Sequence, residues 1–181
     1  MTTTFRVLLA AAALLAAVAC GEGDESPDEV GASARAIIEG PDGHAFGQVL
    51  LTQAPSGVLI SAELSGLTPG AHGFHIHAVG ACTPDFTAAG SHFAPGGEPH
   101  GFLHEEGPHA GDLPNIHANE DGVARVDYFT AAVTLDADKD HSLFDEDGSA
   151  FIVHADPDDY RDVASAGARV ACGVIERSQG D

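Results

Sequence analysis

The sequence predicts an all-β domain of short antiparallel strands, arranged as a sandwich or a flattened barrel. After the first 20 residues no long stretch shows strong helical periodicity, and seven strand-length apolar runs alternate with turn sequences. Glycine (22) and proline (10) are frequent, as they are in proteins whose strands are joined by turns. With 181 residues and 44% apolar content, the chain is long enough for one core and short for two.

The N-terminal residues have the composition of a signal peptide. Arg6 precedes an apolar run at 7–19 that is shorter than the roughly 20 residues a bilayer span needs. The run ends in small residues, and the segment AVAC at 17–20 resembles a lipobox, whose cysteine becomes the lipid-modified N-terminus. We therefore expect a lipoprotein-type signal peptide at 1–19 and a lipid on Cys20. Ordinary cleaved secretion and a retained anchor are the alternatives.

Residues 20–34 are expected to form an acidic linker between the lipid and the folded domain, which is expected at 35–177. The net charge of the whole chain is −21. Such a charge argues against electrostatic binding to nucleic acid or to anionic lipid, because both attract basic proteins. Contact with a membrane is therefore expected only through the anchor at Cys20.

The seven apolar runs give the expected strands in chain order, separated by sequences such as Pro-Asp-Gly and Glu-Asp-Gly that form turns. Residues 78–118 are the exception, because they are rich in Gly, Pro and His and show little strand pattern. A loop of that length in a compact domain is usually functional. The runs are ARAIIEG from 34, FGQVLLTQ from 46, GVLISAEL from 57, GFHIHAV from 73, GVARVDYFTAAVTL from 122, SAFIVHA from 149 and ARVACGVIE from 168.

Histidines are the residues that indicate chemistry. His75 and His77 flank one residue of an expected strand, so both rings project from the same face. An isolated pair of this kind is a weak indication of metal, but the irregular segment and a later strand add further donors. Neutral imidazole suits copper and zinc, and three histidines with one carboxylate suit a tetrahedral zinc. The additional donors are His92, His100, His109, Asp112 and His154.

The three cysteines cannot all pair within one chain. If Cys20 carries a lipid, Cys82 and Cys172 remain to form one disulfide in an oxidising compartment. The loop between them would hold about 90 residues, and its closure is worth roughly 4–5 kcal/mol in the chain-entropy model, as an upper figure.

Five segments, taken in order over about residues 35–176, resemble the successive signatures of the copper,zinc superoxide dismutase family: GFHIHAVGACTPDFTAAGSHFAP, EPHG, GPHAGDLPN, FIVHADPDD and GARVACGVIE. The short HAVGAC spacing is more similar to bacterial, exported members than to eukaryotic cytosolic ones. The resemblance implies an eight-stranded antiparallel Greek-key β-barrel, of immunoglobulin-like sandwich architecture, with a long metal-binding loop. It implies an enzyme that disproportionates two superoxide anions to oxygen and hydrogen peroxide, using one copper and one zinc per subunit.

The resemblance also implies a role for each site residue. His92 would bridge the two metals and donate a proton, Arg169 would dock the superoxide anion, and Cys82 would pair with Cys172. Asp158 would link histidines on the copper and zinc sides, with Asp156 and Asp159 as competitors for that role. The copper ligands would be His75, His77, His92 and His154, and the zinc ligands His92, His100, His109 and Asp112.

Electrostatic steering of the substrate is the weak part of the match. Only 14 residues separate His154 from Arg169, and Arg161 is the single cation among them. The chain from Gly31 onward has 23 acidic and 6 basic residues, a net charge of −17. Long-range repulsion of superoxide is therefore expected unless positive potential is focused at the site.

Two other functions are compatible with part of this pattern. One is a non-catalytic superoxide-dismutase-like module that binds copper and zinc, and the other is a structural domain that holds zinc alone. The complete copper ligand set and Arg169 argue against both. The expected location is the periplasm or the cell surface, as a membrane-anchored lipoprotein, and both a monomer and a dimer are compatible with the sequence.

Overall fold

The computed structural model of the chain describes residues 1–2 and 31–178. Within that part of the chain it contains short strands and a single turn of 3-10 helix, η1. No helix among these residues is long and apolar enough to cross a membrane. The elements are β1 (Ser33–Glu39), β2 (Ala45–Ala54), β3 (Gly57–Leu64), β4 (Gly70–His72), β5 (Phe74–His77), η1 (Phe86–Ala89), β6 (Ile116–Ala118), β7 (Ala124–Thr130), β8 (Ala150–His154), β9 (Arg169–Val174) and β10 (Glu176–Arg177).

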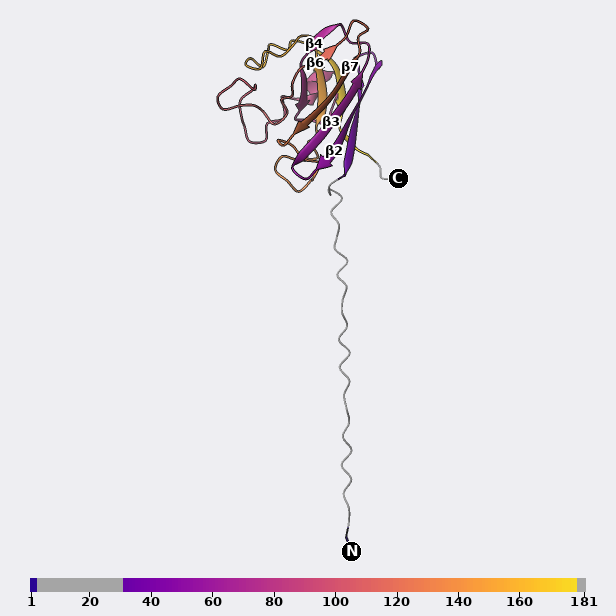
Figure 1. Cartoon of the computed structure of the whole chain (residues 1–181), viewed down its shortest axis with the longest axis vertical. Helices are drawn as coiled ribbons and strands as arrows, with labels where there is room; N and C mark the ends of the chain where they lie inside the picture. The colour runs from indigo at the N-terminus through magenta and orange to yellow at the C-terminus, as the bar shows by residue number, and fades with distance from the viewer. Residues whose placement is uncertain (3–30, 179–181) are drawn as a thin grey trace.

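Eight of the strands form one antiparallel sheet in the order β5-β8-β9-β1-β2-β3-β7, with β10 paired to β1. The pairs β5 with β8, β9 with β1 and β3 with β7 join strands that are not consecutive in the sequence, as in a Greek key. Figure 1 shows the sheet curled around its core, with β2, β3 and β7 side by side. The predicted all-β Greek-key architecture is confirmed.

Period-two alternation places the core on one face of the sheet. In β1 the side chains of Ala34, Ala36 and Ile38 are buried while the residues between them are exposed. β3 alternates in the same way, and the two strands flank β2 in register. Apolar side chains from these strands pack together with the stacked rings of Phe74 and Phe151, whose centroids lie 5.0 Å apart. Because alternate residues of a strand lie on opposite faces of the sheet, burial of one set in this core places the other set on the opposite face.

β5 and β8 differ from the other strands because both of their faces are buried. Phe74 and Ile76 of β5 enter the core, while His75 and His77 occupy the opposite face under the long loop. The loop also pairs with the free edge of β5, since Ile76 N–H donates to the Gly111 carbonyl and Phe93 N–H donates to the Ile76 carbonyl. Isolated bridges pair His75 with Asp112 and His77 with His92.

Some element boundaries differ from those expected. β1 begins at Ser33, inside the expected linker 20–34, because Gly31 and Ala32 already pair with Gln53 of β2. The apolar run from 122 to 135 gives a strand only as far as Thr130. Two three-residue strands, β4 and β6, were not predicted, since segments so short have no detectable alternation. Cys20 and most of the expected signal peptide lie outside the described residues.

Candidate metal centre

The first group of donors comprises four buried histidines from β5, β8 and the long loop. Their donor atoms all lie within 4.8 Å of one another. The His75 ring centroid is 4.2 Å from that of His92 and 5.0 Å from that of His154, and the His77 and His92 centroids are 4.8 Å apart. Burial lowers the pKa of His77 to about 2 and that of His154 to about 4, so both rings are neutral at neutral pH.

Three ring nitrogens in this group are buried and have no hydrogen-bond partner: His75 Nδ1, His77 Nε2 and His154 Nε2. The other nitrogen of each ring faces an oxygen. His75 Nε2 lies 2.9 Å from Asp158 Oδ2, His77 Nδ1 lies 3.0 Å from the Gly90 carbonyl oxygen, and His154 Nδ1 lies 3.2 Å from that of Gly167. These acceptors hold the protons of the neutral rings and leave three lone pairs directed into the group. Unpaired buried lone pairs cost free energy, and a bound cation would satisfy them.

The second group is built around the carboxylate of Asp112. The Nδ1 atoms of His92, His100 and His109 lie 2.8, 3.0 and 3.2 Å from Asp112 Oδ1. A tetrahedral zinc with ligand atoms at about 2.0–2.1 Å separates those atoms by roughly 3.3 Å, which is close to these distances. The donor set of three imidazoles and one carboxylate therefore fits zinc in kind and in spacing.

Asp112 is held as an anion. Burial alone would raise the pKa of its carboxyl, but hydrogen bonds from His92 and from the Gly101 N–H lower the pKa below its ordinary value. Asp112 Oδ2 accepts from the backbone N–H groups of Gly101 at 2.8 Å and His109 at 3.0 Å. The chain thus supplies a charged ligand whose second oxygen is fixed by the loop.

Two residues connect the groups. His92 belongs to both, since its ring contacts those of His75 and His77 on one side and its Nδ1 faces Asp112 on the other. Asp158 is 4% exposed and links the groups from behind, with Oδ2 facing His75 Nε2 and Oδ1 lying 3.1 Å from His100 Nε2. Asp158, and not Asp156 or Asp159, is the carboxylate in this position.

A cavity of about 490 Å³ opens next to the donors and is lined by His77, His92, His154, Val163 and Arg169, among others. Arg169 donates from Nη1 to the Phe86 carbonyl and from Nη2 to the Gly90 carbonyl, both at 2.6 Å. Burial lowers the pKa of Arg169 and nearby Asp85 opposes that shift, and guanidinium remains charged in proteins. A fixed positive charge therefore borders the cavity.

The predicted disulfide is confirmed, with Cys82 and Cys172 joined at a Cα–Cα distance of 5.9 Å. It lies in a small apolar cluster that also contains Ala89, Ile152 and Phe86. The bond ties the 82–90 segment, which carries the two carbonyls that bind Arg169, to strand β9, which carries Arg169 itself. Disulfides of this kind persist in oxidising compartments.

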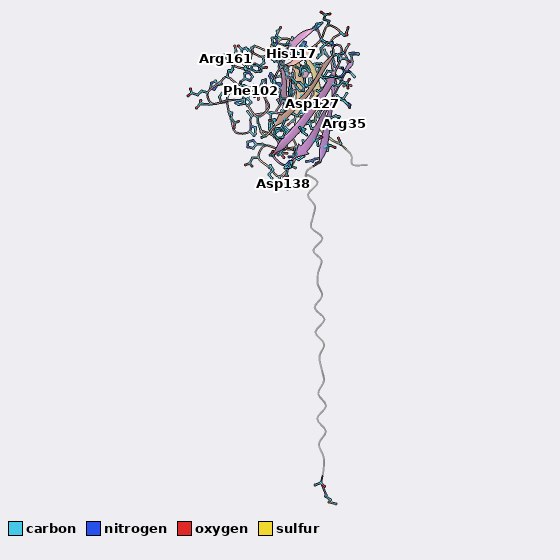
Figure 2. All side chains as sticks on the ribbon, viewed as in Figure 1. Arg35, Phe102, His117, Asp127, Asp138 and Arg161 are labelled. Atoms are coloured by element: carbon cyan, nitrogen blue, oxygen red, sulfur yellow. A yellow bond between two sulfur atoms is a disulfide. The ribbon has the colours of Figure 1, made fainter. Side chains whose placement is uncertain are left out.

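Arg161, the other cation near the site, is exposed, and the described lining of the cavity does not include it. Figure 2 shows Arg161 and Phe102 on the same side of the molecule, on loops that project away from the sheet. Arg169 is therefore the one arginine or lysine among the described residues that line the cavity.

Sequence reasoning did not identify several supporting groups. The carbonyls of Phe86, Gly90 and Gly167 have no sequence signature, because every residue carries a carbonyl. Asn115, the last residue of the GPHAGDLPN segment, binds the backbone of Asp158 and could have been suspected from its place in that segment. His72 also supports the site, with Nδ1 2.7 Å from the His154 carbonyl oxygen.

Comparison with known proteins agrees with a centre that binds copper and zinc. A family model described as copper/zinc superoxide dismutase matches residues 45–175. Copper-zinc superoxide dismutase 1 of Aquifex aeolicus is 47% identical over 145 residues, which cover 78% of this chain and 86% of the relative. A copper-zinc superoxide dismutase of Caulobacter vibrioides is 46% identical over 149 residues, 80% of this chain and 86% of the relative.

Solved structures agree. The crystal structure of a SOD-like protein from Bacillus subtilis is 37% identical with a TM-score of 0.73, over 77% of this chain and 96% of that one. A double mutant of a SOD-like protein from Bacillus subtilis gives 39% identity and a TM-score of 0.73, over 77% of this chain and 95% of that one. The family match over most of the chain, together with the identity of these relatives, shows that the chain belongs to the copper/zinc superoxide dismutase family.

Proposed function

We propose that the chain disproportionates superoxide at the two-group histidine centre, with copper held by His75, His77, His92 and His154 and zinc by His92, His100, His109 and Asp112. The observation that carries the assignment is the set of three buried, unpartnered nitrogens in the group of four histidines that includes the shared His92. Copper supplies the reversible one-electron chemistry, and zinc, which has no redox chemistry, is structural. Two superoxide anions and two protons give one oxygen and one hydrogen peroxide.

The chain's own residues supply binding, orientation and a proton. Gly90 and Gly167 carbonyls and the Asp158 carboxylate fix the tautomers of three histidines, so the same nitrogens always face the copper position. His92 has Nδ1 against Asp112, so its Nε2 is the nitrogen left for the copper side. That nitrogen would serve as a copper ligand and, when not bound to the metal, could hold the proton that passes to the reduced substrate. Arg169 attracts and orients the anion at the wall of the cavity.

Arg169→Ala is expected to lower kcat/KM by about tenfold, which corresponds to roughly 1.4 kcal/mol. Superoxide dismutases are among the enzymes that approach the diffusional ceiling of about 10⁸–10⁹ M⁻¹s⁻¹, so loss of local attraction should reduce the capture rate. Pulse radiolysis of the copper-loaded variant measures this rate. Arg125→Ala, which removes the same charge from a surface pair with Glu63, is the matched control and should keep the wild-type rate.

Salt dependence separates docking from bulk charge, because screening weakens attraction and repulsion over a Debye length of about 10 Å at 0.1 M. In the wild type, attraction by Arg169 and repulsion by the acidic surface should partly cancel, which gives a shallow dependence. In Arg169→Ala only repulsion remains, so added salt should raise the rate. A variant with the wild-type rate and the same salt slope would refute the docking role, and a fully metal-loaded wild type without turnover would favour a metal-binding module.

We further propose that the chain is exported and anchored by a lipid on Cys20 after removal of residues 1–19. The disulfide supports an oxidising location. The 12 residues between Cys20 and Ser33 span at most about 40 Å when extended, so the domain would remain close to the membrane surface.

Cys20→Ser is expected to release the protein from the membrane fraction, because lipidation requires the thiol. Fractionation of the native host followed by mass analysis of the N-terminal peptide measures both location and modification. Ala17→Leu, which places the commonest lipobox residue at that position, is the control and should remain anchored. A wild-type protein that is soluble and unlipidated in its host would show the proposal to be wrong.

A further inference from the structure

Asn115 connects the two loops that build the metal centre. Its side-chain oxygen accepts from the Asp158 N–H at 2.8 Å, and its side-chain nitrogen donates to the Asp158 carbonyl at 2.8 Å. An amide is the side chain that can satisfy a backbone donor and a backbone acceptor together. Asn115 lies three residues after Asp112 and immediately before β6. One short segment therefore carries the carboxylate of the second donor group and binds the loop that follows β8.

Asp158, whose backbone is hydrogen-bonded to Asn115, has its carboxylate between the two donor groups. Asp158 faces His75 with one oxygen and His100 with the other, and that second oxygen also accepts from Tyr160 N–H at 2.7 Å and from the Ser165 hydroxyl at 3.1 Å. A shift of the Asp158 backbone would therefore move the acceptor that orients a ring in each group. Both polar groups of this backbone, the Asp158 N–H and carbonyl, are bonded to the Asn115 side chain.

Two tyrosines in turn hold the main chain of Asn115. The Tyr128 hydroxyl, from β7, donates to the Asn115 carbonyl at 2.9 Å, and the Tyr160 hydroxyl accepts from the Asn115 N–H at 2.9 Å. Burial raises the pKa of Tyr128 to about 12, so its hydroxyl keeps the donated proton. Tyr160 has a φ of 63°, a left-handed conformation that is uncommon for a residue other than glycine. Its surroundings over-determine that conformation, since its carbonyl also accepts from Leu103 N–H.

We propose that Asn115 is a positioning residue that sets the zinc affinity of the protein by fixing Asp158 between the two donor groups. The inference rests on the proposed assignment of zinc to His92, His100, His109 and Asp112. The hydrogen bonds of Asn115 go to Asp158 and the two tyrosines, which are not members of either donor group. Asn115 acts by transmitting the rigidity of β7, through Tyr128, to the acceptor that orients His100, so that less ordering remains to be done when zinc binds.

The test is competition for zinc between a chromophoric chelator and the metal-free, disulfide-bonded protein. Asn115→Leu removes both side-chain bonds, keeps a similar volume and leaves the two main-chain bonds to the tyrosines in place. Its zinc affinity is expected to fall by about tenfold to a hundredfold, the range found when groups that orient metal ligands are removed. His117→Leu, an exposed position two residues further on, is the matched control and should bind zinc as the wild type does.

Tyr128→Phe is a second, milder variant, because it deletes one hydroxyl and keeps the ring. It should weaken zinc binding in the same direction but by less. Denaturant unfolding of each metal-free variant separates positioning from a general loss of stability. A general loss of stability would lower the unfolding midpoint and leave zinc affinity unchanged. If Asn115→Leu and Tyr128→Phe both bind zinc as tightly as the wild type, the positioning role is overturned and the metal assignment stands. If the wild type itself binds no zinc, the metal assignment and the positioning role are both overturned.

Discussion

His154→Ala is expected to remove copper from the protein and reduce superoxide dismutation to background, while zinc is retained. His154 belongs only to the first donor group, and its Nε2 is one of the three unpartnered nitrogens. His100→Ala should do the reverse and lose zinc first, because His100 belongs only to the second group. Metal content measured on each purified variant, beside its dismutation rate, decides between these outcomes.

Some coupling between the two metals is expected and has a structural cause. His92 is common to both groups, and loss of His100 also removes one of the three hydrogen-bond partners of Asp158 Oδ1. His100→Ala should therefore lower copper affinity modestly as well as thermal stability, since metal binding to the native state adds to folding free energy. His141→Ala, at an exposed histidine outside both groups, is the control for removal of an imidazole. Equal loss of both metals in both variants would contradict two separable sites.

Removal of the disulfide is expected to lower the free energy of unfolding by about 2–5 kcal/mol. The bond closes a loop with a sequence separation of 90 residues, so the unfolded chain gains considerable freedom when it is absent. The variant is Cys82→Ser with Cys172→Ser, which leaves no unpaired partner thiol. Denaturant unfolding of the metal-free variant and of metal-free wild type gives the difference directly.

The same double variant should also lose activity, because the bond holds the segment whose Phe86 and Gly90 carbonyls bind Arg169. The rate constant of the copper-loaded variant should fall toward that of Arg169→Ala. A thiol reductant supplies the control, since it should weaken the wild type and have no effect on the double variant. An unchanged unfolding midpoint in the double variant would show that the bond does not stabilise the fold.

The fold class, the succession of the main strands along the chain and the chemical kind of the centre could be predicted from the sequence. Strand periodicity is local, so β1, β3 and the His75–His77 pair on β5 could be placed without knowledge of their neighbours. Imidazole and carboxylate are identifiable as metal donors from residue type alone. The identity of the disulfide followed from residue count once Cys20 was set aside, and the bond is present.

Which atoms lie in contact became known only from the folded structure. The structure shows that Asp158, and not a neighbouring carboxylate, contacts histidines of both groups. It also shows which nitrogen of three rings has no partner, and that Arg169 binds two backbone carbonyls. It also joined Asn115 to Asp158 across 43 positions of the chain. The physical reason is that these contacts are made by backbone groups and by residues far apart in sequence, whose proximity depends on how the sheet curls and how the loops pair with its edge. Residue type and periodicity do not predict that packing.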